Sequence, residues 1–218
     1  MKLSEVIARQ TEKKTGGQTL GDRPRTPVDK RALKVIRTRE TPNPNALQFV
    51  LNAQILETGN KSYSSLDDCG DDKLGRALFK NDAVKNVYIM KNFVTVTKQD
   101  TAGWNPLKTQ IWNLIDELVE VYPSEEAAKT ANVDVSDFNS LPHEKKLEAI
   151  EMVLNRSIRS QLAQDGGGVV LQGMEGKEVQ IHYQGACENC PSSMTGTLQH
   201  IEKLIKQQLD RDLVVKSV

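Results

Sequence analysis

Residues 185–193 read Gly-Ala-Cys-Glu-Asn-Cys-Pro-Ser-Ser and contain two of the three cysteines of this 218-residue chain. The stretch lies where one sequence pattern gives way to another. Before it, residues 179–183 alternate apolar and polar side chains, which is typical of a strand with one buried face. After it, apolar residues recur at helical spacing, so a helix of about five turns is predicted from about Pro191.

The cysteine pair, Cys187 and Cys190, is therefore predicted to lie at the start of a helix. Unpaired N–H groups in the first helical turn carry partial positive charge, which favours thiolate over thiol. Both sulfurs are expected to be nucleophilic and able to bind metal. Two sulfurs at this spacing can converge on one metal or one edge of a cluster, but a four-thiolate site needs two more.

Composition excludes several classes of protein. Twenty-nine basic residues balance twenty-nine acidic ones, so there is no basic excess of the kind that marks a nucleic-acid surface. No apolar run approaches the roughly 18 residues of a membrane span, and the first residues lack the apolar core of a signal peptide, so we expect a soluble, unexported protein. Three cysteines with one close pair indicate metal binding or redox chemistry, not a disulfide framework.

Residues 1–33 are polar and mix basic with acidic residues, and we expect a flexible tail. Presequences that direct proteins to mitochondria are poor in acidic residues. Four acidic residues therefore favour a cytoplasmic location over the mitochondrial matrix. They are Glu5, Glu12, Asp22 and Asp29.

A first domain is predicted over residues 34–122. Two hairpins, each followed by a helix, give the order ββαββα with helices on one side of an antiparallel sheet. The expected strands span residues 35–39, 46–51, 84–90 and 93–97, and the expected helices span residues 74–79 and 105–121. The first hairpin turns at Thr41-Pro42-Asn43-Pro44-Asn45, whose residue types suit a tight turn and equally a recognition surface.

A second domain is predicted over residues 142–218, after a linker at 123–141 with a short helix over 125–130. One long helix should run from Pro142 to about Leu162 and end at Asp165-Gly166-Gly167-Gly168. Two strands, the cysteine junction with its helix, and a terminal strand follow, in the order αββαβ. The strands are expected at residues 169–174, 179–183 and 213–218. The fold class is therefore α+β, with two small domains.

Two separate stretches resemble one family, the NifU-like (Nfu) iron–sulfur cluster scaffold and carrier proteins. The C-terminal resemblance is carried by residues 165–167, 185–193, 197–198 and 201–202. The N-terminal resemblance is carried by residues 41–47, residues 93–98 and Trp104, and it matches the Nfu N-terminal domain. The two domains also follow each other in the order that the family has.

The resemblance implies a protein that receives or assembles a [4Fe-4S] cluster between two chains, with a [2Fe-2S] form as the alternative. It implies a homodimer when loaded, a supply of clusters from upstream assembly machinery, and apo iron–sulfur proteins as recipients. Such a protein is not an enzyme and has no nucleic-acid or membrane partner. Only Cys187 and Cys190 are implied as cluster or metal ligands, and Cys69 inherits no role.

Two other interpretations of the cysteine pair remain as alternatives to a cluster site. A thiol-disulfide oxidoreductase also places Cys-x-x-Cys at a helix start, but only one helix and one strand follow Cys190, too little to complete a thioredoxin sheet. Zinc bridging two chains would use the same four thiolates. Cys69 is expected in an exposed acidic loop without a function, and His182 and His200 are expected to be surface residues.

Overall fold

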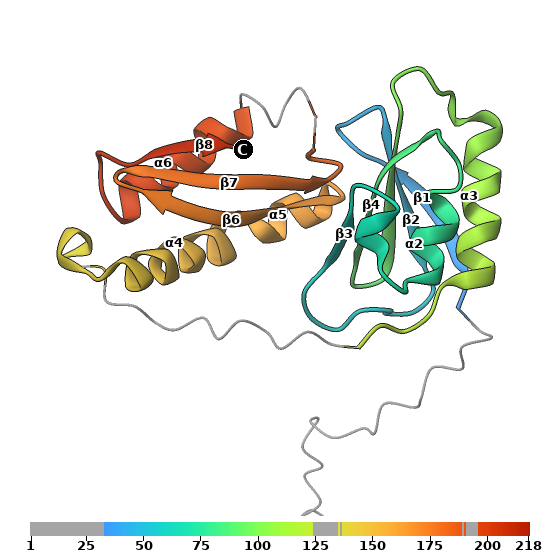
Figure 1. Cartoon of the computed structure of the whole chain (residues 1–218), viewed down its shortest axis with the longest axis horizontal. Helices are drawn as coiled ribbons and strands as arrows, with labels where there is room; N and C mark the ends of the chain where they lie inside the picture. The colour runs from blue at the N-terminus through green and yellow to red at the C-terminus, as the bar shows by residue number, and fades with distance from the viewer. Residues whose placement is uncertain (1–32, 124–134, 136, 189, 191–195) are drawn as a thin grey trace, which may run out of the picture.

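The computed structural model describes residues 33–123, 135, 137–188, 190 and 196–218. These residues form two mixed helix-and-sheet domains, each with its own hydrophobic core, lying next to each other (Figure 1). The expectation of two α+β domains is confirmed. The short helix expected over 125–130 and the tail over 1–32 lie outside the described residues, whereas Leu33, counted with the tail, is buried in the first core.

The first domain is built on a five-stranded antiparallel sheet in the order β1-β2-β5-β4-β3. Its strands are β1 Val35–Glu40, β2 Ala46–Leu51, β3 Lys61–Tyr63, β4 Val84–Met90 and β5 Phe93–Lys98. The two expected hairpins are confirmed by the β1–β2 and β4–β5 pairings. The edge strand β3 was not expected, because three residues are too few for an alternating pattern to be recognised.

One face of this sheet packs against helices α2 Lys73–Leu78 and α3 Trp104–Leu118, as expected (Figure 1). Apolar residues from alternate strand positions, including Phe49, Val87 and Val94, form a core with Ile111 and Ile115 of α3. The short helix α2 is capped by Asp72, whose carboxylate accepts a hydrogen bond from the backbone N–H of Gly75 at 2.8 Å. The 3-10 helix η2 Asp67–Cys69 precedes it.

The opposite face of the sheet is also buried, which an isolated antiparallel sheet of this kind would not need. Every residue of β2 and β5 is buried, although their alternate positions on this face include Gln48, Thr95 and Thr97. The second domain covers this face, with β7 in contact with β4 and β5. The sheet is therefore sandwiched between its own helices and the second domain.

The second domain contains a three-stranded sheet in the order β6-β7-β8. The antiparallel pair β6–β7 is extended by β8, which runs parallel to β7. Its elements are α4 His143–Ser157, α5 Arg159–Gln164, β6 Gly167–Glu175, β7 Glu178–Gly185, α6 Leu198–Gln208 and β8 Val214–Ser217. The elements follow in the expected order. The 3-10 helix η3 Phe138–Ser140 precedes α4, and Phe138, placed in the linker by sequence, is buried in this core.

The single helix expected from residue 142 to residue 162 is in fact two helices. Ile158 departs from helical geometry, with φ −115° and ψ −51°, and α5 starts after it. Ile158 and Leu162 are both buried, so the apolar period continues through the break and conceals it in the sequence.

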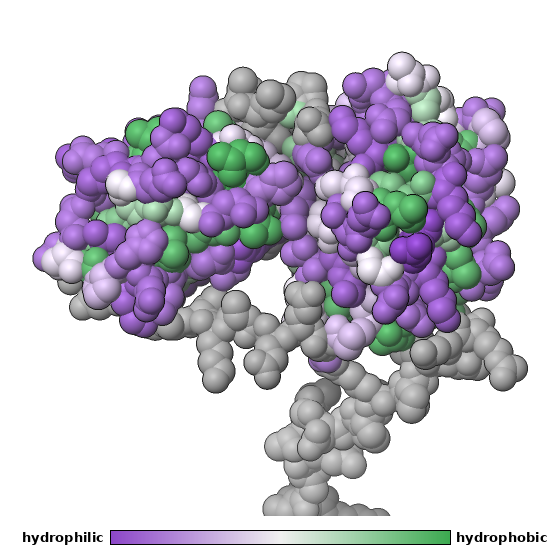
Figure 2. Space-filling model, in the orientation of Figure 1, coloured by the Kyte–Doolittle hydropathy of each residue, from purple (hydrophilic) through white to green (hydrophobic). Residues whose placement is uncertain are grey.

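Hydrophilic side chains cover most of the visible face of both domains, with apolar side chains between them in small groups (Figure 2). Within the described part of the chain, no helix combines the length and the apolar character needed to cross a membrane.

Candidate metal centre

The two cysteines of the pair follow strand β7 in a series of tight turns. The N–H of Cys187 donates to the carbonyl of Gln184, that of Glu188 to Gly185, and that of Cys190 to Cys187, at 3.1 to 3.3 Å. Both cysteines are outside any disulfide and are buried, with exposed fractions of 4% for Cys187 and 2% for Cys190. The turns thus bring two thiols to one end of the β6–β7 hairpin.

Gly167 makes room for the sulfur of Cys187. A Cβ at position 167 would lie 2.6 Å from the Cys187 Sγ and 2.7 Å from its backbone nitrogen, closer than real atoms approach. Residue 167 pairs with residue 185 across the hairpin, and the preceding Gly166 has a left-handed φ of 84°. The glycine run and the cysteine stretch, which are separate in sequence, are therefore two sides of one site.

Gly185 lets the first domain approach the same loop. Its φ is 62°, and a Cβ there would lie 2.8 Å from the carbonyl oxygen of Gly166 and 2.8 Å from the Cβ of Tyr88 on β4. Burial, and secondarily the nearby Cys187, raise the pKa of Tyr88 far above its usual value. The same two causes raise the pKa of Tyr183 in β7. Both tyrosines are therefore neutral beside the Cys187 sulfur.

Two asparagines of the first domain bind the loop directly. The Asn43 Nδ2 donates to the carbonyl oxygen of Ala186 at 3.0 Å and, at 3.5 Å, to that of Glu188. The Asn86 Nδ2 donates to the Glu188 carboxylate at 2.6 Å. Burial raises the pKa of Glu188, while His182 and Lys85 act in the opposite direction. Glu188, the residue after Cys187, is thus held by the other domain.

Sequence reasoning missed the role of Asn43. The turn at residues 41–45 does form, with the Thr41 hydroxyl donating to the carbonyl oxygens of Asn43 and Ala46 and accepting from the N–H of Asn43. The side chain of Asn43 also accepts from the N–H of Asn45, while its amide nitrogen reaches the second domain. The only sequence signal was the family resemblance of the turn, because asparagine is common in turns for local reasons.

The expectation that Cys69 is exposed is wrong. Its side chain is 4% exposed, and its Sγ donates to the carbonyl oxygen of Ser65 at 3.4 Å within the first core. Burial first, and then Asp72 and Asp68, raise the pKa of the Cys69 thiol from 9.0 to about 11. Neighbouring acidic residues made the segment look like an exposed loop, but η2 turns the cysteine inward beside Gly75.

The two histidines on either side of the motif were expected at the surface and not as ligands. The Nδ1 of His182 lies 2.8 Å from the carbonyl oxygen of Val218 at the chain's end, and His200 is exposed on α6. Among the residues that the structure describes, no three His, Cys, Asp or Glu side chains gather as a metal would require. One chain therefore offers two thiols beside a glycine that accommodates sulfur, which fits half of a Cys-ligated cluster.

The helix start expected near Pro191 lies outside the described residues, and α6 is described from Leu198 onward. Activation of the cysteines by a helix N-terminus therefore stays a prediction.

Comparison with known proteins identifies both domains. Residues 36–121 match the model for the scaffold protein Nfu/NifU N-terminal domain, and residues 150–216 match the model for the NifU-like domain. These two matches, one for each domain, define the class: two-domain scaffold proteins of iron–sulfur cluster assembly. The chain belongs to the NifU-like (Nfu) family.

Similar curated proteins carry the same designation. The chain is 31% identical to the human "NFU1 iron-sulfur cluster scaffold homolog, mitochondrial" over 78% of its own length and 66% of the relative's. It is 29% identical to the protein of the same name from Drosophila erecta, over 87% and 68%. It is 28% identical to "NifU-like protein 5, mitochondrial" from Arabidopsis thaliana, over 82% and 66%. The chain thus spans about two thirds of the length of these relatives.

Solved structures include a NifU-like protein from Saccharomyces cerevisiae, at 23% identity and a TM-score of 0.40 over 50% of this chain and 100% of that one. Another is protein SAV1430 from Staphylococcus aureus, at 23% identity and a TM-score of 0.34 over 38% and 98%.

The expectation of a cytoplasmic location is wrong by this comparison. The similar proteins from human, fly and plant are all named mitochondrial. The expectation depended on acidic residues within residues 1–33, and the composition of so short a segment is weak evidence about the compartment of a protein.

Proposed function

We propose that this protein holds an iron–sulfur cluster between two copies of the chain and delivers it to apo iron–sulfur proteins. The cluster is cargo: [4Fe-4S] is the form proposed, with [2Fe-2S] as the alternative. The observation that carries the proposal is the pair of buried thiols, Cys187 and Cys190, on a tight loop beside Gly167, in a chain of the NifU-like family. Mitochondria are the proposed compartment, in keeping with the names of the relatives.

The number of thiols sets the stoichiometry. A Cys-ligated cluster takes four thiolates, and each chain supplies two, so two chains complete the set. The cysteines must lose their protons to bind iron, so loading releases protons and depends on pH. Gly185 and Ala186 beside the pair have little or no side chain, so they would not obstruct a second chain once the loop is exposed.

Delivery follows from ligand exchange. A thiolate of the recipient binds one iron, and the sulfur of Cys187 or Cys190 that it displaces takes up a proton. Repeating this exchange moves the cluster without any net oxidation or reduction. The protein therefore acts as a carrier, supplied by upstream assembly machinery, and not as an enzyme with its own turnover.

Anaerobic reconstitution of the full chain with iron and sulfide tests the ligands. We expect Cys187→Ala and Cys190→Ala each to abolish stable loading, measured by absorption and Mössbauer spectroscopy, because each removes two of the four shared ligands. Cys69→Ala is the matched control and should load normally. Native mass spectrometry should find one cluster per two chains.

A monomer with one complete cluster per chain would contradict the proposal, as would normal loading of Cys187→Ala. Zinc fits the same four thiolates, so zinc is measured beside iron in the protein as isolated. Stoichiometric zinc that resists replacement by iron and sulfide would instead indicate a structural zinc site.

The carrier role is tested by transfer. Loaded protein is mixed with an apo [4Fe-4S] enzyme, and the return of that enzyme's activity is followed against an equal amount of free iron and sulfide. We expect faster recovery with the loaded protein. Recovery at the rate of the free ions would exclude a carrier and leave a site that only stores the cluster.

A further inference from the structure

The second buried face of the first domain's sheet carries a small apolar cluster that includes Val50 and Phe93. It also carries five residues with polar groups, here called the docking face: Gln48, Asn86, Tyr88, Thr95 and Thr97. These residues occupy alternate positions of β2, β4 and β5, on the side opposite the α2 and α3 helices. Each is 3% exposed or less. Polar side chains of this kind usually stand where a sheet meets water, yet these five are covered.

The cover is the cysteine end of the second domain. The β6–β7 end of that domain points toward the first sheet in Figure 1. A Cβ on Gly166 would lie 3.0 Å from the Thr95 Oγ1, and one on Gly168 would lie 2.7 Å from the Tyr88 hydroxyl oxygen. The Gln48 Nε2 donates to the carbonyl oxygen of Ala163 at 3.5 Å. Together with Asn43 and Asn86, these contacts hold the residues that flank the cysteines.

Several polar atoms buried in this contact have no hydrogen-bond partner. Within the described residues, four side-chain oxygens of the docking face are buried without a hydrogen-bond partner: those of Gln48, Asn86, Thr95 and Thr97. Across the contact, the Gln184 Oε1 has none either. A buried polar atom without a partner costs free energy, and that cost disappears when the face returns to water. A contact of this kind is suited to opening and closing.

We propose that the docking face binds the cysteine loop of its own chain, that is residues 185–188 and Cys190, and covers it while no cluster is bound. The docking face separates from this loop before a second chain shares a cluster. The last step rests on the proposed function. Cys187 and Cys190 are 4% and 2% exposed in the closed arrangement, so a cluster bridging two chains cannot form there. Docking and cluster sharing therefore compete for one loop.

Thr95→Lys should break the docking contact and leave the first domain folded. Thr95 is fully buried, and its Oγ1 faces Gly166 of the second domain, so in an open molecule its side chain would stand on a solvated sheet face. Lysine there blocks closure, because a charge would be buried without a partner. Gln99→Lys adds the same charge at an exposed position just beyond β5 and is the matched control.

The first measurement needs no cluster. Amide NMR of the full cluster-free chain should show both domains tumbling together in the wild type and in Gln99→Lys. In Thr95→Lys they should tumble separately, with shifts at Gly185, Ala186 and Glu188, and a closing equilibrium weakened at least about tenfold. Separate tumbling of the wild-type domains would overturn the proposal, as would joint tumbling in Thr95→Lys with its fold intact.

The second measurement concerns the competition. Loading of the wild type should separate the domains, and Thr95→Lys should load severalfold faster than Gln99→Lys. If the wild type and both variants load at one rate and the loaded wild type stays closed, competition between docking and cluster sharing is excluded. If none of them takes up a cluster while the NMR results hold, the proposed function fails and the docking contact stands.

Discussion

At the scale of single residues, the site depends on a glycine as much as on its cysteines. Replacing Gly167 by alanine would place a methyl group 2.6 Å from the Cys187 Sγ and 2.6 Å from the carbonyl oxygen of Gln184. Because the latter is backbone, the crowding cannot be relieved by a side-chain rotation. We expect Gly167→Ala to lower the free energy of unfolding by about 1–3 kcal/mol, measured by denaturant titration, and to reduce cluster loading.

Gly173→Ala is the control in the same strand. A Cβ at position 173 meets nothing within 4 Å, so the change should leave both the stability and the loading close to those of the wild type. Equal behaviour of the two variants would show that the loop adapts, and that Gly167 is not required for the position of the sulfur.

Cys69 gives a prediction about pH. With its pKa raised to about 11 by burial and two aspartates, about one thiol in a thousand is ionised at pH 8. Iodoacetamide should therefore label Cys69 far more slowly than it labels a small thiol, and the rate should rise about tenfold per pH unit up to pH 11. Peptide mass spectrometry of the native chain provides the measurement, with the urea-unfolded chain as the reference.

The same shift affects stability. In the folded protein the pKa of Cys69 is raised above the ordinary 9.0. The contribution of the buried thiol to the free energy of unfolding is therefore fully present below pH 9 and is lost as the pH rises toward 11. Rapid labelling at pH 8 without unfolding would contradict both the burial and the raised pKa.

The cysteine pair could be predicted as the ligand site from sequence because nine consecutive residues make up the motif, and a motif of this length is local information. Other parts of the site could not. Gly167 acquires its role only through pairing with Gly185 across the hairpin, and Asn43 only through contact with Ala186, 143 residues later. Cys69 was misplaced because its acidic neighbours indicated exposure, whereas burial is decided by the direction of each side chain.

At the scale of elements, one arginine joins two helices to a strand. The Arg159 guanidinium donates to both oxygens of Glu151, at 2.6 and 3.0 Å, and to Asn155 at 2.6 Å. Its Nε donates to the carbonyl oxygen of Val169 at 3.1 Å. These bonds fix α4, α5 and β6 around the break at Ile158, and thereby the position of the glycine run that follows α5.

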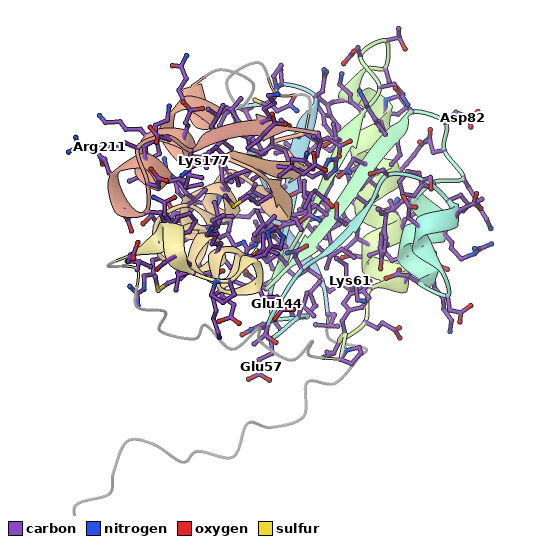
Figure 3. All side chains as sticks on the ribbon, turned by 60° about the vertical axis from the view of Figure 1, so that its left-hand side comes forward. Glu57, Lys61, Asp82, Glu144, Lys177 and Arg211 are labelled. Atoms are coloured by element: carbon purple, nitrogen blue, oxygen red, sulfur yellow. The ribbon has the colours of Figure 1, made fainter. Side chains whose placement is uncertain are left out.

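Arg159→Lys keeps the charge but cannot reproduce the paired bonds to Glu151 or the bond to Val169. We expect a loss of about 1–2 kcal/mol in the free energy of unfolding, measured by denaturant titration. Arg211→Lys is the control, since Arg211 is exposed and lies at the outer end of the second domain (Figure 3). A loss no larger for Arg159→Lys than for Arg211→Lys would mean that the helix break is maintained by apolar packing alone.

Elements with a sustained apolar period were predictable, and those without one were not. The hairpins at residues 35–51 and 84–98 show clear alternation, and both form. Strand β3 is too short for a period, and the break at Ile158 leaves the apolar period intact because buried residues lie on both sides of it. A three-residue edge strand and a helix break are decided by tertiary contacts, which the local pattern does not contain.

At the scale of the whole molecule, the sequence predicted two domains but not their contact. The residues of the docking face have the composition of a solvated sheet surface, and the loop that covers it is remote in sequence. Asp82 and Arg211 lie at opposite outer ends of the molecule (Figure 3). The cysteine loop lies at the contact between the domains, where Asn43 and Asn86 of the first domain bind it. The arrangement gives the first domain two candidate roles. Covering the cysteine loop would slow cluster loading, whereas recruiting recipients would speed cluster transfer.

The last prediction separates those roles with a fragment spanning residues 137–218, which retains its own core from Phe138 to Val215. If the first domain covers the cysteine loop, the fragment should load a cluster severalfold faster than the full chain. If the first domain also recruits recipients, the fragment should transfer its cluster more slowly to at least some of them, because tethering raises the local concentration of the cluster beside a bound recipient.

Full-length Thr95→Lys completes the comparison, because its first domain is open but still attached. It should load as fast as the fragment and transfer as fast as the wild type, with cluster content matched in all three proteins and several apo acceptors at low concentration. Slow transfer by Thr95→Lys would place recruitment on the docking face itself. Equal transfer by all three proteins to every acceptor would leave covering the loop as the first domain's role.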